Sequence, residues 1–100
     1  MVRHVVSWNF RDDVPEERRN EIMKELAAAF PTLIGKIPGL LKVEVGMPPF
    51  KSSNCDMVLY CEMEKEEDLA VYRDHPDHVA IAQIIRANCK ERRCTDIIAG

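Results

Sequence analysis

The residues with the clearest chemical potential are a tyrosine and two histidines that lie close together in the sequence. Tyr72 precedes the segment His75-Pro76-Asp77-His78, so two of the three histidines stand three residues apart. Proline is typical of the first position of a helix, which places His78 in the first helical turn, on the apolar side. The positive end of the helix dipole disfavours an imidazolium, so we expect a neutral His78 near pH 7. We therefore predict that His78 and Tyr72 form an acid/base pair able to exchange a proton with an acidic C–H or O–H group.

The third histidine is expected to join this pair. His4 belongs to an alternating segment whose apolar side should face the same helices. His4, His78 and Tyr72 then converge on one cavity between helices and sheet, the usual form of a small-molecule site. The candidate ligand-binding residues of this cavity are His4, Trp8, Phe10, Met57, Leu59 and His75, with Met63 beside them.

Two other interpretations of the histidines remain open. In a structural one, His75 caps the helix and His78 makes a single buried hydrogen bond. In another, His75 and His78 are metal ligands at i, i+3 spacing, although no carboxylate or cysteine is clearly placed to complete their shell. We predict no metal site and no cofactor.

Four strands are expected to position these residues. Apolar and polar residues alternate over residues 2–10, 41–47, 55–63 and 93–98. In the third of these segments, Met57, Leu59, Cys61 and Met63 share one face. Each strand therefore has one side suited to a core.

Helical periodicity fills the gaps between the strands. One helix is expected to begin at Pro15 and to carry an apolar stripe of Ile22, Leu26, Phe30, Leu33 and Ile37. At Pro31 it either kinks or gives way to a second short helix. Residues 65–72 predict a short acidic helix, and another begins at Pro76, with Ile81, Ile85 and Cys89 on its inner face.

The order β-α-β-β-α-β predicts an α+β, ferredoxin-like fold with one antiparallel sheet and the helices on one face. The other face stays open and is expected to carry Val5, Leu40, Val58, Tyr60 and Ile97 among polar residues such as Arg3, Asn9 and Glu62. An apolar patch of that extent is unusual on a monomer, and pairing two sheets about a twofold axis buries it. We predict a homodimer through the open sheet face. The alternative is a monomer in which this amphipathic sheet face is exposed to solvent.

Composition limits the class of protein. The chain has 100 residues, 46% of them hydrophobic and 31% charged, which fits a single soluble domain over residues 1–100. Its net charge of −3 argues against nucleic-acid binding, which needs a basic face. Neither a membrane-length apolar run nor a signal-peptide pattern is evident, so we expect a cytoplasmic protein without a membrane partner.

The four cysteines fit a reducing compartment. Cys55, Cys61, Cys89 and Cys94 form no CxxC pair, and we expect free thiols. Cys61 and Cys89 are interpreted as small buried hydrophobic residues.

Several segments resemble the stress-responsive A/B barrel domain family, whose members are dimeric α+β barrels. They are residues 2–10, Ile37-Pro38-Gly39-Leu40, residues 56–60 and residues 72–79, whose Tyr…His-Pro-x-His element is the most specific. The resemblance runs through essentially the whole chain in order. It implies a ferredoxin-like fold and a dimer whose two sheets form a joint barrel.

A more distant resemblance bears on activity. In plant polyketide cyclases of the olivetolic acid cyclase type, the catalytic tyrosine and histidine match Tyr72 and His78, and a pocket histidine matches His4. Met57 stands where those enzymes have another pocket histidine, so polyketide cyclisation is not expected to carry over. Three classes of function remain: a binder of a small apolar ligand, an acid/base enzyme (cyclase, isomerase or lyase) acting on a small carbonyl compound, and a non-catalytic protective or assembly module.

Overall fold

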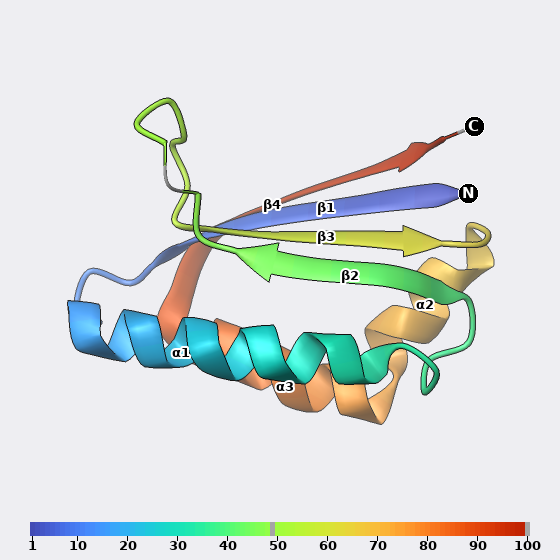
Figure 1. Ribbon diagram of the computed structural model, residues 1–100, viewed down its shortest axis with the longest axis horizontal. Coiled ribbons are helices and arrows are strands. Elements are labelled where there is room, and N and C mark those ends of the chain that lie inside the picture. Colours follow the sequence, from blue (N-terminus) through green and yellow to red (C-terminus); the bar gives the residue numbers. More distant parts are fainter. Residues whose placement is uncertain (49, 100) are drawn as a thin grey trace.

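One antiparallel sheet with helices on a single face forms the domain (Figure 1). The computed structural model describes residues 1–48 and 50–99. Along the chain the elements are β1 (Val2–Phe10), α1 (Glu16–Ala29), the 3-10 helix η1 (Phe30–Leu33), β2 (Leu40–Gly46), β3 (Met57–Met63), α2 (Glu67–Asp74), α3 (Pro76–Asn88) and β4 (Cys89–Ile98). The strand order is β2-β3-β1-β4, which confirms the predicted ferredoxin-like fold.

Strand β1 occupies the centre of this sheet. It pairs antiparallel with β3 on one side and with β4 on the other. Its residues alternate as the sequence predicts, because Val2, His4, Val6, Trp8 and Phe10 are all buried under the helices. The strand therefore supplies one continuous row of side chains to the core.

The first helix ends where the sequence places a proline. Helix α1 stops at Ala29, and η1 follows directly with Pro31 in its first turn. Proline has no N–H to continue the α-helical bonds, so the tighter 3-10 turn takes over. The question left open by the sequence is thus answered in favour of a second short helix. The predicted apolar stripe survives the change, since its members are at most 2% exposed: Ile22, Leu26, Phe30, Leu33 and Ile37.

One prediction for the open face is wrong. Leu40 was expected there but is only 5% exposed and pairs with Met63 on the core side. The register shifts between Leu40 and Lys42, so Leu41 is an extra residue and becomes 47% exposed. The bulge moves Leu40 into the core, and a simple alternation pattern cannot reveal it.

The last strand is longer than predicted. It begins at Cys89, which pairs with Phe10 and is buried, whereas the sequence placed Cys89 on the helix before it and the strand start at Arg93. As expected, Cys61 is buried as well, and both are free thiols. None of the described helices is long and apolar enough to cross a membrane.

A glycine and a buried carboxylate join the two halves of the domain. Asp68 is 5% exposed, and its carboxylate accepts a hydrogen bond from the Lys65 N–H. The backbone of Gly39, with φ +83, passes directly beside this carboxylate and leaves no room for a Cβ. The start of β2 and the start of α2 are therefore packed against each other at a position that requires glycine.

We predict that Gly39→Ala lowers the free energy of unfolding by about 2 kcal/mol or more, because it adds a clash to the cost of a left-handed alanine. Gly35 also has a positive φ of +88 but nothing within 4 Å of an added Cβ. Gly35→Ala should therefore cost about 1 kcal/mol. Gly46→Ala, with neither feature, should be close to neutral. Urea unfolding of the three variants checks this order, and equal values for Gly35→Ala and Gly39→Ala would contradict the role given to Asp68.

Candidate functional site

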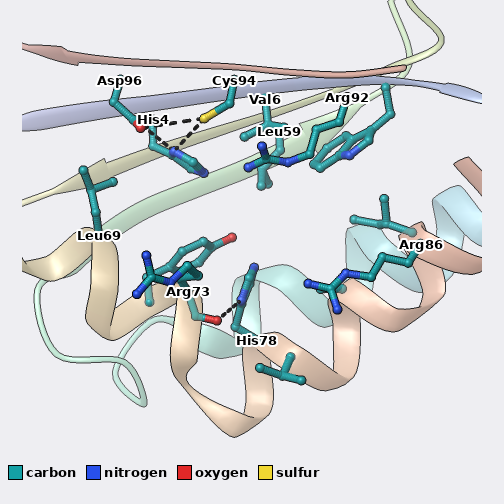
Figure 2. A pocket seen from close by; sticks show the side chains of 15 residues that line it. His4, Val6, Leu59, Leu69, Arg73, His78, Arg86, Arg92, Cys94 and Asp96 are labelled. Atoms are coloured by element: carbon teal, nitrogen blue, oxygen red, sulfur yellow. Dashed lines mark hydrogen bonds and ion pairs between the residues drawn. The ribbon is translucent and has the colours of Figure 1, made fainter. Parts of the chain in front are cut away.

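A cavity of about 490 Å³ lies between the sheet and helices α2 and α3 (Figure 2). Its apolar wall includes Val6, Trp8, Leu59, Ala82 and Ile85. The volume falls within the range of small-molecule sites, and the wall is mainly aliphatic and aromatic. The cavity can therefore hold a compact organic molecule.

His78 projects from the first turn of α3 into this cavity. Its Nδ1 lies 3.0 Å from the carbonyl oxygen of Arg73, at the end of α2. A carbonyl oxygen only accepts, so Nδ1 carries the proton in the neutral ring and Nε2 keeps its lone pair. Figure 2 shows this second ring nitrogen directed towards the sheet, into the cavity. The bond thus fixes the tautomer in which His78 can accept a proton.

The environment of His78 favours the neutral ring. Burial lowers the pKa of His78 below its ordinary value of 6.5, the hydrogen bond to the Arg73 carbonyl partly opposes the shift, and the charges of Arg86 and Arg92 add to it. A base with a pKa below neutrality is unprotonated and available at pH 7.

Tyr72 lies against His78 from the neighbouring helix. The two ring centroids are 4.1 Å apart, and the Tyr72 side chain is buried from solvent. Burial raises the pKa of the Tyr72 hydroxyl above its ordinary value of 10.0, and the Cys61 thiol adds to the shift. The Cys61 thiol itself donates to the Tyr72 oxygen at 3.9 Å. Tyr72 therefore keeps its own proton, which remains free to be donated to a bound molecule.

His4 enters the cavity from the sheet side. Its ring centroid is 5.7 Å from that of Tyr72, and its Nδ1 lies 2.5 Å from an Asp96 carboxylate oxygen on the adjacent strand β4. The carboxylate accepts a hydrogen bond from the His4 Nδ1–H, so the His4 ring is also anchored through Nδ1. Two imidazoles, each anchored through Nδ1, thus line the cavity together with Tyr72.

The same corner holds a group of potential metal ligands. His4 Nδ1, the Cys94 thiol and an Asp96 carboxylate oxygen lie within 4.8 Å of one another. A nitrogen, a sulfur and an oxygen donor suit a zinc ion, but the His4 Nδ1 would first have to release the proton that it donates to Asp96. His75 and His78, the pair considered from sequence, do not form such a group: the His75 ring accepts from the Asp77 N–H as a helix cap.

The structure separates the sequence-predicted ligand-binding residues into two groups. His4, Trp8, Leu59, Tyr72 and His78 line the cavity. Phe10, Met57 and His75 do not. Phe10 and Met57 are buried in the core, with the Arg19 guanidinium over the Phe10 ring, and His75 caps α3.

The sequence analysis missed the polar residues that β4 contributes. Arg92, Cys94 and Asp96 all line the cavity, as do Arg73 and Arg86 from the helices. The predicted alternation over residues 93–98, with Ile97 on the open face, puts Cys94 and Asp96 on the helix side, but neither was connected with the cavity, and Arg92 precedes the predicted strand.

An irregularity in β4 decides that face. Asn9 pairs with Lys90 and Ser7 pairs with Arg93, so two residues, Glu91 and Arg92, stand opposite Trp8. Glu91 adopts φ 56, a left-handed conformation that is uncommon outside glycine. This bulge restores the alternation one residue later, and it brings Arg92, Cys94 and Asp96 to the helix side of the sheet.

Comparison with known families now identifies the chain. The profile of the stress-responsive A/B barrel domain matches residues 2–99. The chain belongs to this family. The comparison with curated proteins gave no match.

Solved structures agree with the family assignment. A dimeric protein of unknown function from Bacteroides fragilis NCTC 9343, with a ferredoxin-like fold, is 33% identical with a TM-score of 0.88, over 96% of this chain and 93% of that one. A dimeric ferredoxin-like protein of unknown function from Thermobifida fusca is 23% identical with a TM-score of 0.80, over 98% and 90%. Hydroxynitrile lyase from Passiflora edulis is 13% identical with a TM-score of 0.75, over 99% and 93%. At the identities of the last two, the likeness to this A/B barrel domain is one of fold alone.

We predict that His78 titrates with a midpoint below 6.5, measured by NMR of the imidazole protons. Since the unfolded chain then binds the proton more readily, the contribution of neutral His78 to stability is complete above pH 6.5 and declines as the pH falls. His78→Gln should make the loss of stability on acidification less steep. A midpoint above 6.5 would contradict the burial of this ring.

Proposed function

We propose that this A/B barrel domain works as a homodimer that binds a small, largely apolar carbonyl compound and transfers a proton on it. The base is His78, the proton donor is Tyr72, and His4 completes the polar side of the cavity. The observation that carries the proposal is the bond from His78 Nδ1 to the Arg73 carbonyl, which leaves Nε2 as an acceptor inside an apolar cavity.

The pairing of these groups suits removal of a proton beside a carbonyl. An unprotonated imidazole takes the proton, while a hydroxyl that stays protonated donates a hydrogen bond to the carbonyl oxygen as negative charge develops on it. The centroid distance of 4.1 Å places the two rings side by side, so both can reach one bound molecule. Cyclases, isomerases and lyases that act on carbonyl compounds share this step.

The dimer is supported by the open sheet face and by related structures. Val58 and Tyr60 on this face are only partly buried, and Ile97 is 48% exposed. The proteins from Bacteroides fragilis and Thermobifida fusca, both of the same fold, are described as dimeric. A second copy packed on this face would cover the apolar side chains.

Proton transfer can be tested without knowing the natural substrate. We expect the protein to accelerate exchange of the α-protons of phenylacetone in D₂O, followed by NMR as loss of the α-proton signals. His78→Ala should abolish the acceleration, and Tyr72→Phe should reduce it by roughly a hundredfold, a typical effect of losing one acid/base group. Because His78 must be unprotonated, the exchange rate should fall as the pH drops below its pKa.

The matched control is His75→Asn, which keeps a helix cap and does not touch the cavity. It should exchange at the wild-type rate. If phenylacetone binds but exchanges no faster than with His78→Ala, the protein binds ligands without turnover and the acid/base proposal is wrong.

The proposed interface gives a separate prediction. Val58→Glu should convert a dimer into a monomer of 11.5 kDa, because a charge would be buried at the centre of the paired sheets. Light scattering coupled to size-exclusion chromatography measures the mass. Val71→Glu, at a 42% exposed valine of α2, is the control and should stay dimeric. A wild-type protein that elutes as a monomer would refute the interface.

A further inference from the structure

Two arginines face the cavity without an acidic partner. Arg92 on β4 and Arg86 on α3 both line it, and Figure 2 shows their guanidinium groups directed towards the space between sheet and helix. Among the described residues, neither side chain forms an ion pair. Arg73, at the other end of the cavity, differs because it makes a two-pronged contact with Asp74 at 2.9 and 3.1 Å.

The charge around the cavity is opposite in sign to that of the whole chain. The chain carries a net charge of −3, yet the cavity lining contains three arginines, Arg73, Arg86 and Arg92, and a single acid, Asp96. Asp96 is engaged by His4 at 2.5 Å. The free charges that a bound molecule would meet are therefore positive, and walls of low dielectric strengthen their field.

The remainder of the wall is apolar. Val6, Trp8 and Leu59 line the sheet side, and Ala82 and Ile85 line the helix side. A fully charged or strongly hydrated molecule would lose water against these side chains without compensation. The lining thus calls for a molecule with one charged end and one apolar end.

We propose that the molecule is an organic carboxylate with an apolar body, held by Arg86 and Arg92 as a clamp on its anionic end. This inference rests on the proposed function and narrows its substrate class, from a small carbonyl compound to one that also carries a carboxylate. The planar fork of a guanidinium matches the two oxygens of a carboxylate, and two such groups can hold it from opposite sides. The carbon chain then lies along Trp8 and Leu59, towards the two histidines.

The test compares two probes with the same apolar chain, octanoate, which is anionic, and octanamide, which is neutral. Trp8 is the only tryptophan of the chain and lines the cavity, so its fluorescence reports occupancy, with calorimetry as a second measurement. We expect octanoate to bind at least about tenfold more tightly than octanamide, which corresponds to about 1.4 kcal/mol. Arg86→Gln and Arg92→Gln should each weaken octanoate binding by about tenfold and leave octanamide binding unchanged.

The control is Lys24→Gln, which removes the same charge from the exposed side of α1. It should leave both affinities unchanged. If Lys24→Gln weakened octanoate binding as much as Arg92→Gln does, the loss of affinity would come from the change in net charge alone, and the clamp would be overturned. Equal affinity of wild-type protein for octanoate and octanamide would overturn the clamp while leaving the small-molecule cavity intact. Absence of any Trp8 response or heat with either probe would overturn the clamp, whereas the proposed function is decided separately by the proton exchange of phenylacetone.

Discussion

The double pairing of β1 is the constraint on which the rest of the molecule depends. Because β1 is hydrogen-bonded to both β3 and β4, each of its residues has a fixed side of the sheet. A slip of one residue would turn His4, Val6 and Trp8 away from the helices and would empty the core. The same pairing that closes the core therefore also places His4 beside Asp96 and opposite Tyr72.

Both histidines of the site are held by the same device from different parts of the chain. His78 is fixed through Nδ1 by a backbone carbonyl at the end of α2, and His4 is fixed through Nδ1 by a carboxylate on β4. In each case the anchor leaves the other ring nitrogen for the cavity. The helix α2, only eight residues long, thus supplies both Tyr72 and the carbonyl that orients its partner. The acid Tyr72 and the base His78 are positioned together because α2 carries both Tyr72 and the Arg73 carbonyl that orients His78.

The sequence predicted the parts of the fold that follow from regular alternation. The limits of β1 and the buried face of β3 were correct, since each has an uninterrupted period of two. Pro31 marked the end of α1 correctly but could not say what followed. Leu40 failed because an extra residue at Leu41 interrupts the pairing, and no glycine, asparagine or proline announces it. Bulges are set by how two strands meet, which one strand's pattern does not contain.

For the site, the sequence identified His78, Tyr72 and His4 as neighbours because a short motif and a strand pattern pointed to one side of the sheet. It did not find Asp96, Cys94, Arg86 and Arg92, which meet at the cavity because of how β4 and α3 pack in the folded chain. Phe10 and Met57 satisfied the same apolar pattern as true lining residues but pack deeper. Pattern gives the side of a strand, whereas only tertiary packing gives the depth.

The left-handed residue Glu91 couples the two surfaces of the sheet. If Glu91 adopted the ordinary extended conformation and paired with Trp8, β4 would return to plain alternation and would exchange Arg92, Cys94 and Asp96 for Arg93, Thr95 and Ile97 on the inner surface. The displaced charges would emerge on the outer surface, where the proposed twin subunit packs. Evolution can therefore vary the residue types along β4 one by one to suit a new ligand. It cannot straighten the bulge while keeping Glu91 without changing the chemistry of the cavity and the contact between subunits in a single step.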